Sequence, residues 1–133
     1  MTIKTTNTNQ TSPFFRPKYA FSKKMRLLKS KEYKNNYSFG RRVYSGPLIA
    51  IAVKKNESEH SRIGLSVAKK VGTAVYRNRI KRFLRECFRT SHLQLLVNYD
   101  LVIVVKKHNT KYAYYDLEKH FTVLLDKINR IDS

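Results

Sequence analysis

Hydrophobic positions recur with a helical period in two long stretches of the chain, residues 73–90 and 114–128. On a wheel of 100° per residue, the apolar side chains of the first stretch occupy one arc. They are Tyr76, Ile80, Phe83, Leu84, Cys87 and Phe88. The second stretch has its apolar side chains at Tyr114, Leu117, Phe121, Leu124, Leu125 and Ile128. Both patterns predict amphipathic helices that pack through one face.

A shorter helix of about ten residues is predicted over residues 30–40. Ser30 suits the N-cap position, Glu32 is favourable in the first turn, and Gly40 is suited to end the helix. Tyr33 and Tyr37 are four residues apart and therefore share one face of this helix.

Four further stretches have the character of β-strands. Residues 41–45 and 48–53 flank the turn pair Gly46–Pro47, and residues 62–68 alternate with Ile63, Leu65 and Val67 on one face. We expect these three strands to form an antiparallel meander. The run 101–105, which follows Asp100, is continuously apolar, as is typical of a central strand covered on both faces.

The predicted element order is therefore α-β-β-β-α-β-α, in which helices cover a mixed sheet of an α+β fold. A chain of 133 residues allows one such domain, which we expect to occupy residues 22–133 and to be ordered from about Met25. Residues 1–21 are polar, contain Pro13 and Pro17 and have no apolar signal segment. They predict a disordered polar extension. A transit peptide is the alternative, because the stretch is free of acids, although it has few Arg and no helical period.

Charge adds a partner to this picture. The chain has 28 Lys and Arg against nine Asp and Glu, a formal charge of +19, and residues 1–89 hold +18 of it. Such self-repulsion is relieved by a polyanion, so a nucleic acid is the expected partner. The single Cys87 cannot form an intramolecular disulfide, and no 18-residue apolar run is long enough to span a bilayer. Both features favour a reducing compartment, the cytoplasm.

The basic side chains crowd most closely between residues 69 and 89, with one acid, Glu86, among them. Eight cations lie in these 21 residues: Lys69, Lys70, Arg77, Arg79, Lys81, Arg82, Arg85 and Arg89. An exposed, merely solubilising face is the usual explanation of a charge run. Here Arg outnumbers Lys five to one between residues 77 and 89, and Arg makes the planar bidentate contacts that suit phosphate. We therefore predict a phosphate-binding surface, with Asn78 on the same side of the helix.

The polypeptide shows no catalytic apparatus of its own. Its acids are scattered, with Glu57 and Glu59 in a loop, and they form no cluster of the kind a two-metal nuclease uses. The histidines, His60, His92, His108 and His120, lack zinc-site spacing. Cys87 lies on the packed helical face, which favours an inert thiol over a nucleophile. Gly64 and Gly72 belong to no phosphate-loop pattern, so we predict no catalytic and no metal-binding residue.

One segment closely resembles the Arg-Asn-Arg segment of the bacterial ribonuclease P protein family. It reads Lys69-Lys70-x-Gly72-x-Ala74-x-x-Arg77-Asn78-Arg79-Ile80-Lys81-Arg82-x-x-Arg85-Glu86. The resemblance extends to Arg26-Leu27, to residues 62–67 and to Tyr99-Asp100-Leu101-Val102, and it covers about residues 25–130. It implies a single α/β sandwich domain whose parallel β-α-β connection is left-handed, an exception to the usual rule.

The resemblance also implies a function. A protein of this family joins a large catalytic RNA and helps it to remove the 5′ leader of precursor tRNA, as the accessory subunit of an endoribonuclease. The RNA holds the catalytic magnesium ions, so no cofactor is expected on the protein alone. The motif residues are expected to contact that RNA: Arg77, Asn78, Arg79, Lys81, Arg82 and Arg85, with Lys69, Lys70 and Arg89 beside them. No membrane and no DNA partner is expected.

The family further implies a cleft between the first helix and the sheet, which holds the single-stranded leader. Tyr33 and Tyr37 match its aromatic positions, and Arg41 and Arg42 are the cations beside them. Rings and cations together bind single strands without sequence preference. Core packing of the two tyrosines is an equally good explanation from the residues alone. Residues 48–53 contain no aromatic where the family often places one.

Two other functions compete with this one. A general RNA-binding or ribosomal-type protein would carry the same basic surface but would not distinguish precursor from mature tRNA. A cationic membrane-surface protein is disfavoured, because the last predicted helix carries mixed charge and a modest apolar arc.

Overall fold

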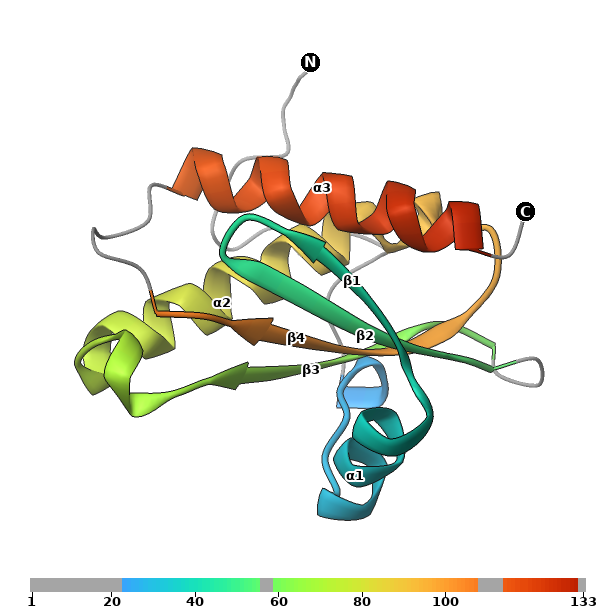
Figure 1. Ribbon diagram of the computed structural model, residues 1–133, viewed down its shortest axis with the longest axis horizontal. Coiled ribbons are helices and arrows are strands. Elements are labelled where there is room, and N and C mark those ends of the chain that lie inside the picture. The colour runs from blue at the N-terminus through green and yellow to red at the C-terminus, as the bar shows by residue number, and fades with distance from the viewer. Residues whose placement is uncertain (1–22, 56–58, 108–113, 132–133) are drawn as a thin grey trace.

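The computed structural model describes residues 23–55, 59–107 and 114–131, and in these ranges the helices lie on both faces of one sheet. Helices α2 (Ala74–Ser91) and α3 (Tyr114–Ile131) cover one face, and α1 (Ser30–Phe39) lies against one end of the other (Figure 1). The strands are β1 (Arg41–Ser45), β2 (Leu48–Lys54), β3 (Arg62–Val67) and β4 (Tyr99–Val105). The α+β class and the element order are confirmed. No helix in these ranges is long and apolar enough to cross a membrane.

The predicted antiparallel meander is wrong at its third strand. The sheet order is β1-β2-β4-β3, so β4 lies between β2 and β3. It pairs antiparallel with β2 and parallel with β3. The reason is burial: β2 and β4 are apolar on both faces and suit the centre of the sheet, whereas β3 places Arg62, Gly64 and Ser66 on one face and suits an edge. The outer edge of β3 is met by a parallel bridge between Arg26 and Ile63.

The main core lies between the sheet and the two long helices. Nine of the twelve apolar positions that the periodicity predicted are buried in it: Ile80, Leu84, Cys87, Phe88, Leu117, Phe121, Leu124, Leu125 and Ile128. Tyr76 and Phe83 are partly buried against it, whereas Tyr114 is 47% exposed. Alternate strand residues, such as Ile63 and Val67 of β3 and Leu101 and Ile103 of β4, face the nine buried positions. The apolar arc of α2 is therefore turned inward, and its basic arc is turned outward.

A smaller apolar cluster lies on the other face, beneath α1. It consists of Leu27, Ile51 and Val102, with Tyr33, Ile49 and Val104 packed against it. The fully buried Asn36 of α1 donates its Nδ2 hydrogens to the carbonyl oxygens of Ile51 and Asp100, at 3.0 and 2.8 Å. A buried amide is therefore one of the groups that hold α1 to the sheet.

The predicted start of α1 is displaced by one residue. Ser30 is the first helical residue, and Lys29 occupies the N-cap position without a side-chain cap. The carboxylate of Glu32 takes over this task, since its Oε1 accepts the backbone N–H groups of Leu28 and Lys29 at 3.1 and 3.0 Å. Gly40 ends the helix as predicted.

Gly46 in the β1–β2 turn is expected to resist substitution. Its φ is +53°, and a Cβ there would lie 2.5 Å from Cε1 and Nε2 of His120 in α3. Gly46→Ala is therefore expected to lower the free energy of unfolding by at least about 1–2 kcal/mol, the cost of the left-handed backbone alone. Thermal unfolding measures this loss. In the background of His120→Ala, Gly46→Ala should lose only the stability that the left-handed backbone costs. An unchanged melting temperature of Gly46→Ala would contradict both causes.

Candidate nucleic-acid interface

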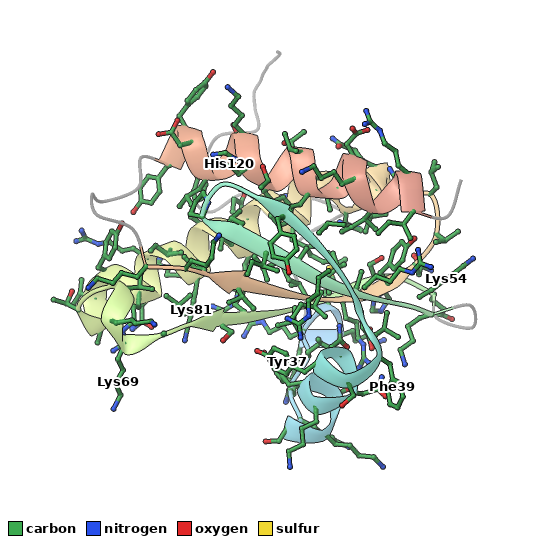
Figure 2. The ribbon with its side chains drawn as sticks, viewed as in Figure 1. Tyr37, Phe39, Lys54, Lys69, Lys81 and His120 are labelled. Atoms are coloured by element: carbon green, nitrogen blue, oxygen red, sulfur yellow. The ribbon has the colours of Figure 1, made fainter. Side chains whose placement is uncertain are left out.

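The start of α2 fixes where the basic surface lies. Thr73 caps the helix, since its Oγ1 accepts the N–H of Tyr76 at 3.2 Å. Gly72 leaves room for the Tyr76 ring, because a Cβ on this glycine would lie 2.5 Å from the ring. Arg77 Nε donates to the Gly72 carbonyl at 3.1 Å. Lys69, just before this helix start, lies at the end of the molecule where β3 leads into α2 (Figure 2).

Most of the predicted RNA-binding side chains point to solvent. Lys69, Lys70, Asn78, Arg79 and Arg82 are exposed, and Arg77, Lys81, Arg85 and Arg89 are partly exposed. We call these nine residues the basic ridge. The structure brings them together along η2 (Lys69–Val71) and the outer side of α2. Their arrangement favours contact with a polyanion over internal pairing.

Two members of the basic ridge already have partners on the protein. Arg89 Nε donates to both carboxylate oxygens of Glu86, at 3.1 and 3.0 Å, and this hydrogen bond raises the pKa of Arg89. Arg77 is held by the Gly72 carbonyl. Of the predicted set, Arg89 is therefore the residue whose charge is most offset within the chain.

Arg85 connects the basic ridge to the first helix. Burial lowers its pKa, and the positive charge of Arg26 acts in the same direction, while Tyr33 of α1 acts in the opposite one. Arg85 thus lies within electrostatic reach of both Arg26 and Tyr33. A bound anion would stabilise the positive charges of these two guanidinium groups.

The two predicted leader-binding tyrosines have different surroundings. Tyr33 is half-buried over Gly64, where a Cβ would lie 2.7 Å from its ring, and its hydroxyl donates to the Leu27 carbonyl at 3.4 Å. Burial raises the pKa of Tyr33. Tyr37, one turn later, is 40% exposed. Of these two tyrosines, Tyr33 therefore has a packing role in the structure, and Tyr37 is the one whose ring is open to a ligand.

The two predicted arginines of this site lie on different faces of the sheet. Arg42 Nη2 donates to the carbonyl of Tyr37 at 3.5 Å, so it lies beside α1. Arg41 instead lines a cavity of about 190 Å³ with Tyr99 and Ile131, on the face that α3 covers. The structure does not bring Arg41 together with Tyr33 and Tyr37, because neighbouring residues of a strand point to opposite faces of the sheet.

Sequence reasoning missed an aromatic residue on the same face as Tyr37. Tyr44 of β1 pairs with Ile49 of β2, whose side chain packs against the cluster beneath α1. Tyr44 is 52% exposed. The signal was the alternation of Arg42, Val43 and Tyr44, in which Val43 packs against the main core. An aromatic missing from residues 48–53 is thus present on the neighbouring strand.

The remaining candidates for chemistry have structural partners. His120 Nδ1 lies 2.8 Å from Ser45 Oγ, and His92 Nδ1 lies 3.0 Å from the Phe88 carbonyl oxygen. Within residues 23–55, 59–107 and 114–131, no three His, Cys, Asp or Glu side chains gather to hold a metal ion. His108 and Glu57 lie outside the described residues, as does the predicted extension 1–21.

Cys87 is expected to be unreactive in the native protein. Burial, with a smaller effect of the Glu118 and Glu86 carboxylates, raises the pKa of its thiol to about 12. Iodoacetamide at about pH 8 should therefore alkylate the folded chain far more slowly than the unfolded chain. Mass spectrometry of the alkylated protein measures the difference, and equal rates would contradict the buried position.

Comparisons with known proteins agree on one family. The family model described as Ribonuclease P matches residues 21–129. The chain is 38% identical over 112 residues to the ribonuclease P protein component of Desulfosudis oleivorans, covering 84% of this chain and 92% of the relative. It is 39% identical over 113 residues to that of Vibrio parahaemolyticus, covering 84% and 94%.

Solved structures agree with the sequence relatives. The RNase P protein of Staphylococcus aureus superposes with a TM-score of 0.71 at 26% identity, covering 78% of this chain and 94% of that one. The RNase P protein of Thermotoga maritima gives 0.68 at 24% identity, covering 77% and 96%, and supports the fold. The chain therefore belongs to the ribonuclease P protein family, the accessory subunits of a tRNA-processing ribonucleoprotein endoribonuclease.

Proposed function

We propose that this chain binds ribonuclease P RNA through the basic ridge and binds the 5′ leader of precursor tRNA through the face beside α1. The observation that supports this most strongly is the position of Arg85. It links the row of cations on α2 to Tyr33 of α1, and α1 lies on the face of the sheet that carries Tyr37, Arg42 and Tyr44. A structured RNA suits the ridge, and an unpaired strand suits exposed rings beside guanidinium groups.

We assign the chemistry of cleavage to the RNA. The acids that the structure brings together, Glu32 and Asp100, both bind Arg62, so they serve the fold. On this proposal the protein holds no cofactor of its own, and the magnesium ions of the reaction belong to the assembled holoenzyme. The place of action is the cytoplasm, and neither DNA nor a membrane is a partner.

Reconstitution tests the proposal. The purified protein alone should leave precursor tRNA intact, and it should restore cleavage at the mature 5′ end when added to a bacterial ribonuclease P RNA at low magnesium. A folded protein that fails to stimulate cleavage would reject the proposed function. The circular dichroism spectrum of the same sample shows whether it is folded.

A general RNA-binding protein is the alternative, favoured by the same basic ridge. It differs in one measurable property, because it would bind precursor and mature tRNA equally well. Affinities of the reconstituted holoenzyme for a precursor with a leader and for the mature product therefore decide between the two functions.

Tyr37→Ala is expected to reduce this discrimination by about 5- to 10-fold, because stacking on one base contributes about 1 kcal/mol or more. Affinity for mature tRNA should stay unchanged. Phe39→Ala is the matched control, since Phe39 is a 78% exposed aromatic of the same helix that lies on another side of it (Figure 2). Equal losses for precursor and mature tRNA would show that Tyr37 serves packing instead.

A further inference from the structure

A second aromatic surface lies between α2 and α3, and the contacts proposed above include its arginines but not its rings. Phe83 of α2 and Tyr114 of α3 stack with ring centroids 4.7 Å apart and planes at 22°. They border a shallow hollow of about 390 Å³, together with Arg79, Arg82 and Glu86. The hollow lies on the side of the sheet that α2 and α3 cover, whereas Tyr37 and Tyr44 lie on the side of α1.

The two rings of the hollow are available to different extents. Phe83 is partly buried and packs against the main core, so it fixes one face of the Tyr114 ring. Tyr114 is 47% exposed. A ring that is backed by another ring and open to solvent is a rigid platform on which a flat group can stack.

The net charge around the hollow is positive. Arg79 and Arg82 are exposed. The one carboxylate at its border, Glu86, accepts hydrogen bonds from Arg89. Its charge is therefore offset by Arg89 and does not neutralise the two arginines. An aromatic platform beside two guanidinium groups is the combination that binds a base together with its phosphates.

We propose that this hollow binds an unpaired nucleobase of ribonuclease P RNA, stacked on Tyr114, with its flanking phosphates on Arg79 and Arg82. The inference rests on the proposed function, since it names a further contact of the same RNA partner. The alternative occupant is an acidic protein segment, which would bind the two arginines and would not need the ring of Tyr114. Binding that depends on the presence of a base therefore distinguishes RNA from an acidic segment.

A single fluorophore tests the stacking directly, because the chain contains no Trp. Tyr114→Trp retains a flat ring, and its emission should be quenched when ribonuclease P RNA or a short oligoadenylate is added. An abasic oligonucleotide of equal charge should quench it much less. Tyr115→Trp is the matched control, since Tyr115 is 74% exposed and borders no part of the hollow. Equal quenching by the abasic strand, or none by either strand, would overturn the proposal.

Binding measurements give an independent test. Tyr114→Leu keeps apolar packing on Phe83 and removes the platform, so affinity for ribonuclease P RNA should fall about 5- to 10-fold, whereas Tyr114→Phe should bind like the parent chain. Discrimination between precursor and mature tRNA should not change. If reconstitution works and Tyr114→Leu binds RNA with parental affinity, this inference fails and the proposed function stands. Failed reconstitution by the parent chain would instead reject the proposed function.

Discussion

Arg62→Met is expected to lower the free energy of unfolding by about 2–4 kcal/mol, somewhat less than the roughly 3–5 kcal/mol of breaking a fully buried ion pair from one side, because the Arg62 side chain is 29% exposed. Arg62 of β3 donates from Nε and Nη2 to the two carboxylate oxygens of Asp100, at 2.9 and 2.7 Å. The Asp100 side chain is 4% exposed. Met has a similar length but no charge, so the carboxylate of Asp100 would remain buried with Lys55 Nζ, 3.8 Å away, as its nearest remaining cation.

The effect extends beyond one pair because Arg62 joins three elements. Its Nη1 donates to Glu32 Oε2 at 2.6 Å, and Glu32 in turn caps α1. The substitution therefore loosens α1 as well as the contact between β3 and β4. Since Tyr37 is carried by α1, leader discrimination should fall together with stability, although Arg62 is not assigned to the RNA contact.

Urea unfolding measures the loss, and a second substitution identifies its cause. Asp100→Asn in the Arg62→Met background should recover part of the stability, because it removes the buried charge that lost its partner. A loss of no more than about 0.5 kcal/mol, the range of ordinary surface substitutions, would show that the network contributes little.

The same network gives an expected dependence on pH. Burial raises the pKa of Glu32, but hydrogen bonds from the Lys29 and Leu28 backbone and from Arg62 outweigh it, so the pKa lies below the ordinary value of 4.5. A lowered pKa contributes stability that is present above the unfolded value and is lost as the pH falls through the folded value. The difference in stability between the parent chain and Arg62→Met should therefore narrow below about pH 4.5.

Local patterns predicted the elements of this fold because local physics determines them. Ile80, Leu84 and Phe88 are buried as their helical spacing requires, and the alternation of β3 assigns Ile63 and Val67 to the main core. The outward position of Arg79 and Arg82 follows from the same wheel. Periodicity thus located the basic ridge before the sheet was known.

Long-range partners were beyond such patterns. The apolar run of residues 101–105 correctly predicted a central strand, but local spacing does not encode that this strand, β4, lies between β2 and β3. Arg62 and Asp100 are 38 residues apart, so their pairing is invisible to local spacing. Alternation along β1 separates Arg41 from Arg42 and Tyr44, but which of the two faces of β1 lies on the side of α1 follows from its register with β2. The site could be predicted where one helix carries it, and less well where two elements meet.

The interface with RNA is expected to depend steeply on salt. If six phosphates are neutralised by the basic ridge, log affinity should fall with log salt at a slope of roughly −4 to −5, because each contact releases condensed counterions. Affinity for ribonuclease P RNA should thus fall by about two to three orders of magnitude for a fourfold rise in salt. A slope near zero would contradict an electrostatic interface.

A combined Arg79→Ala, Lys81→Ala and Arg82→Ala variant should show which residues cause this slope. Its magnitude should fall by about 2–3, and affinity at about 0.1 M salt should fall roughly 100-fold. The melting temperature should change little, because Arg79 and Arg82 are exposed and Lys81 is partly exposed. Lys119→Ala is the control: Lys119 is an exposed cation of α3 and no member of the basic ridge, and its loss should leave the slope nearly unchanged. A large loss of melting temperature in the triple variant would mean that these side chains support the fold. A slope change in Lys119→Ala of about one third of that in the triple variant, the share of one charge in three, would mean that net charge, and not the basic ridge, binds the RNA.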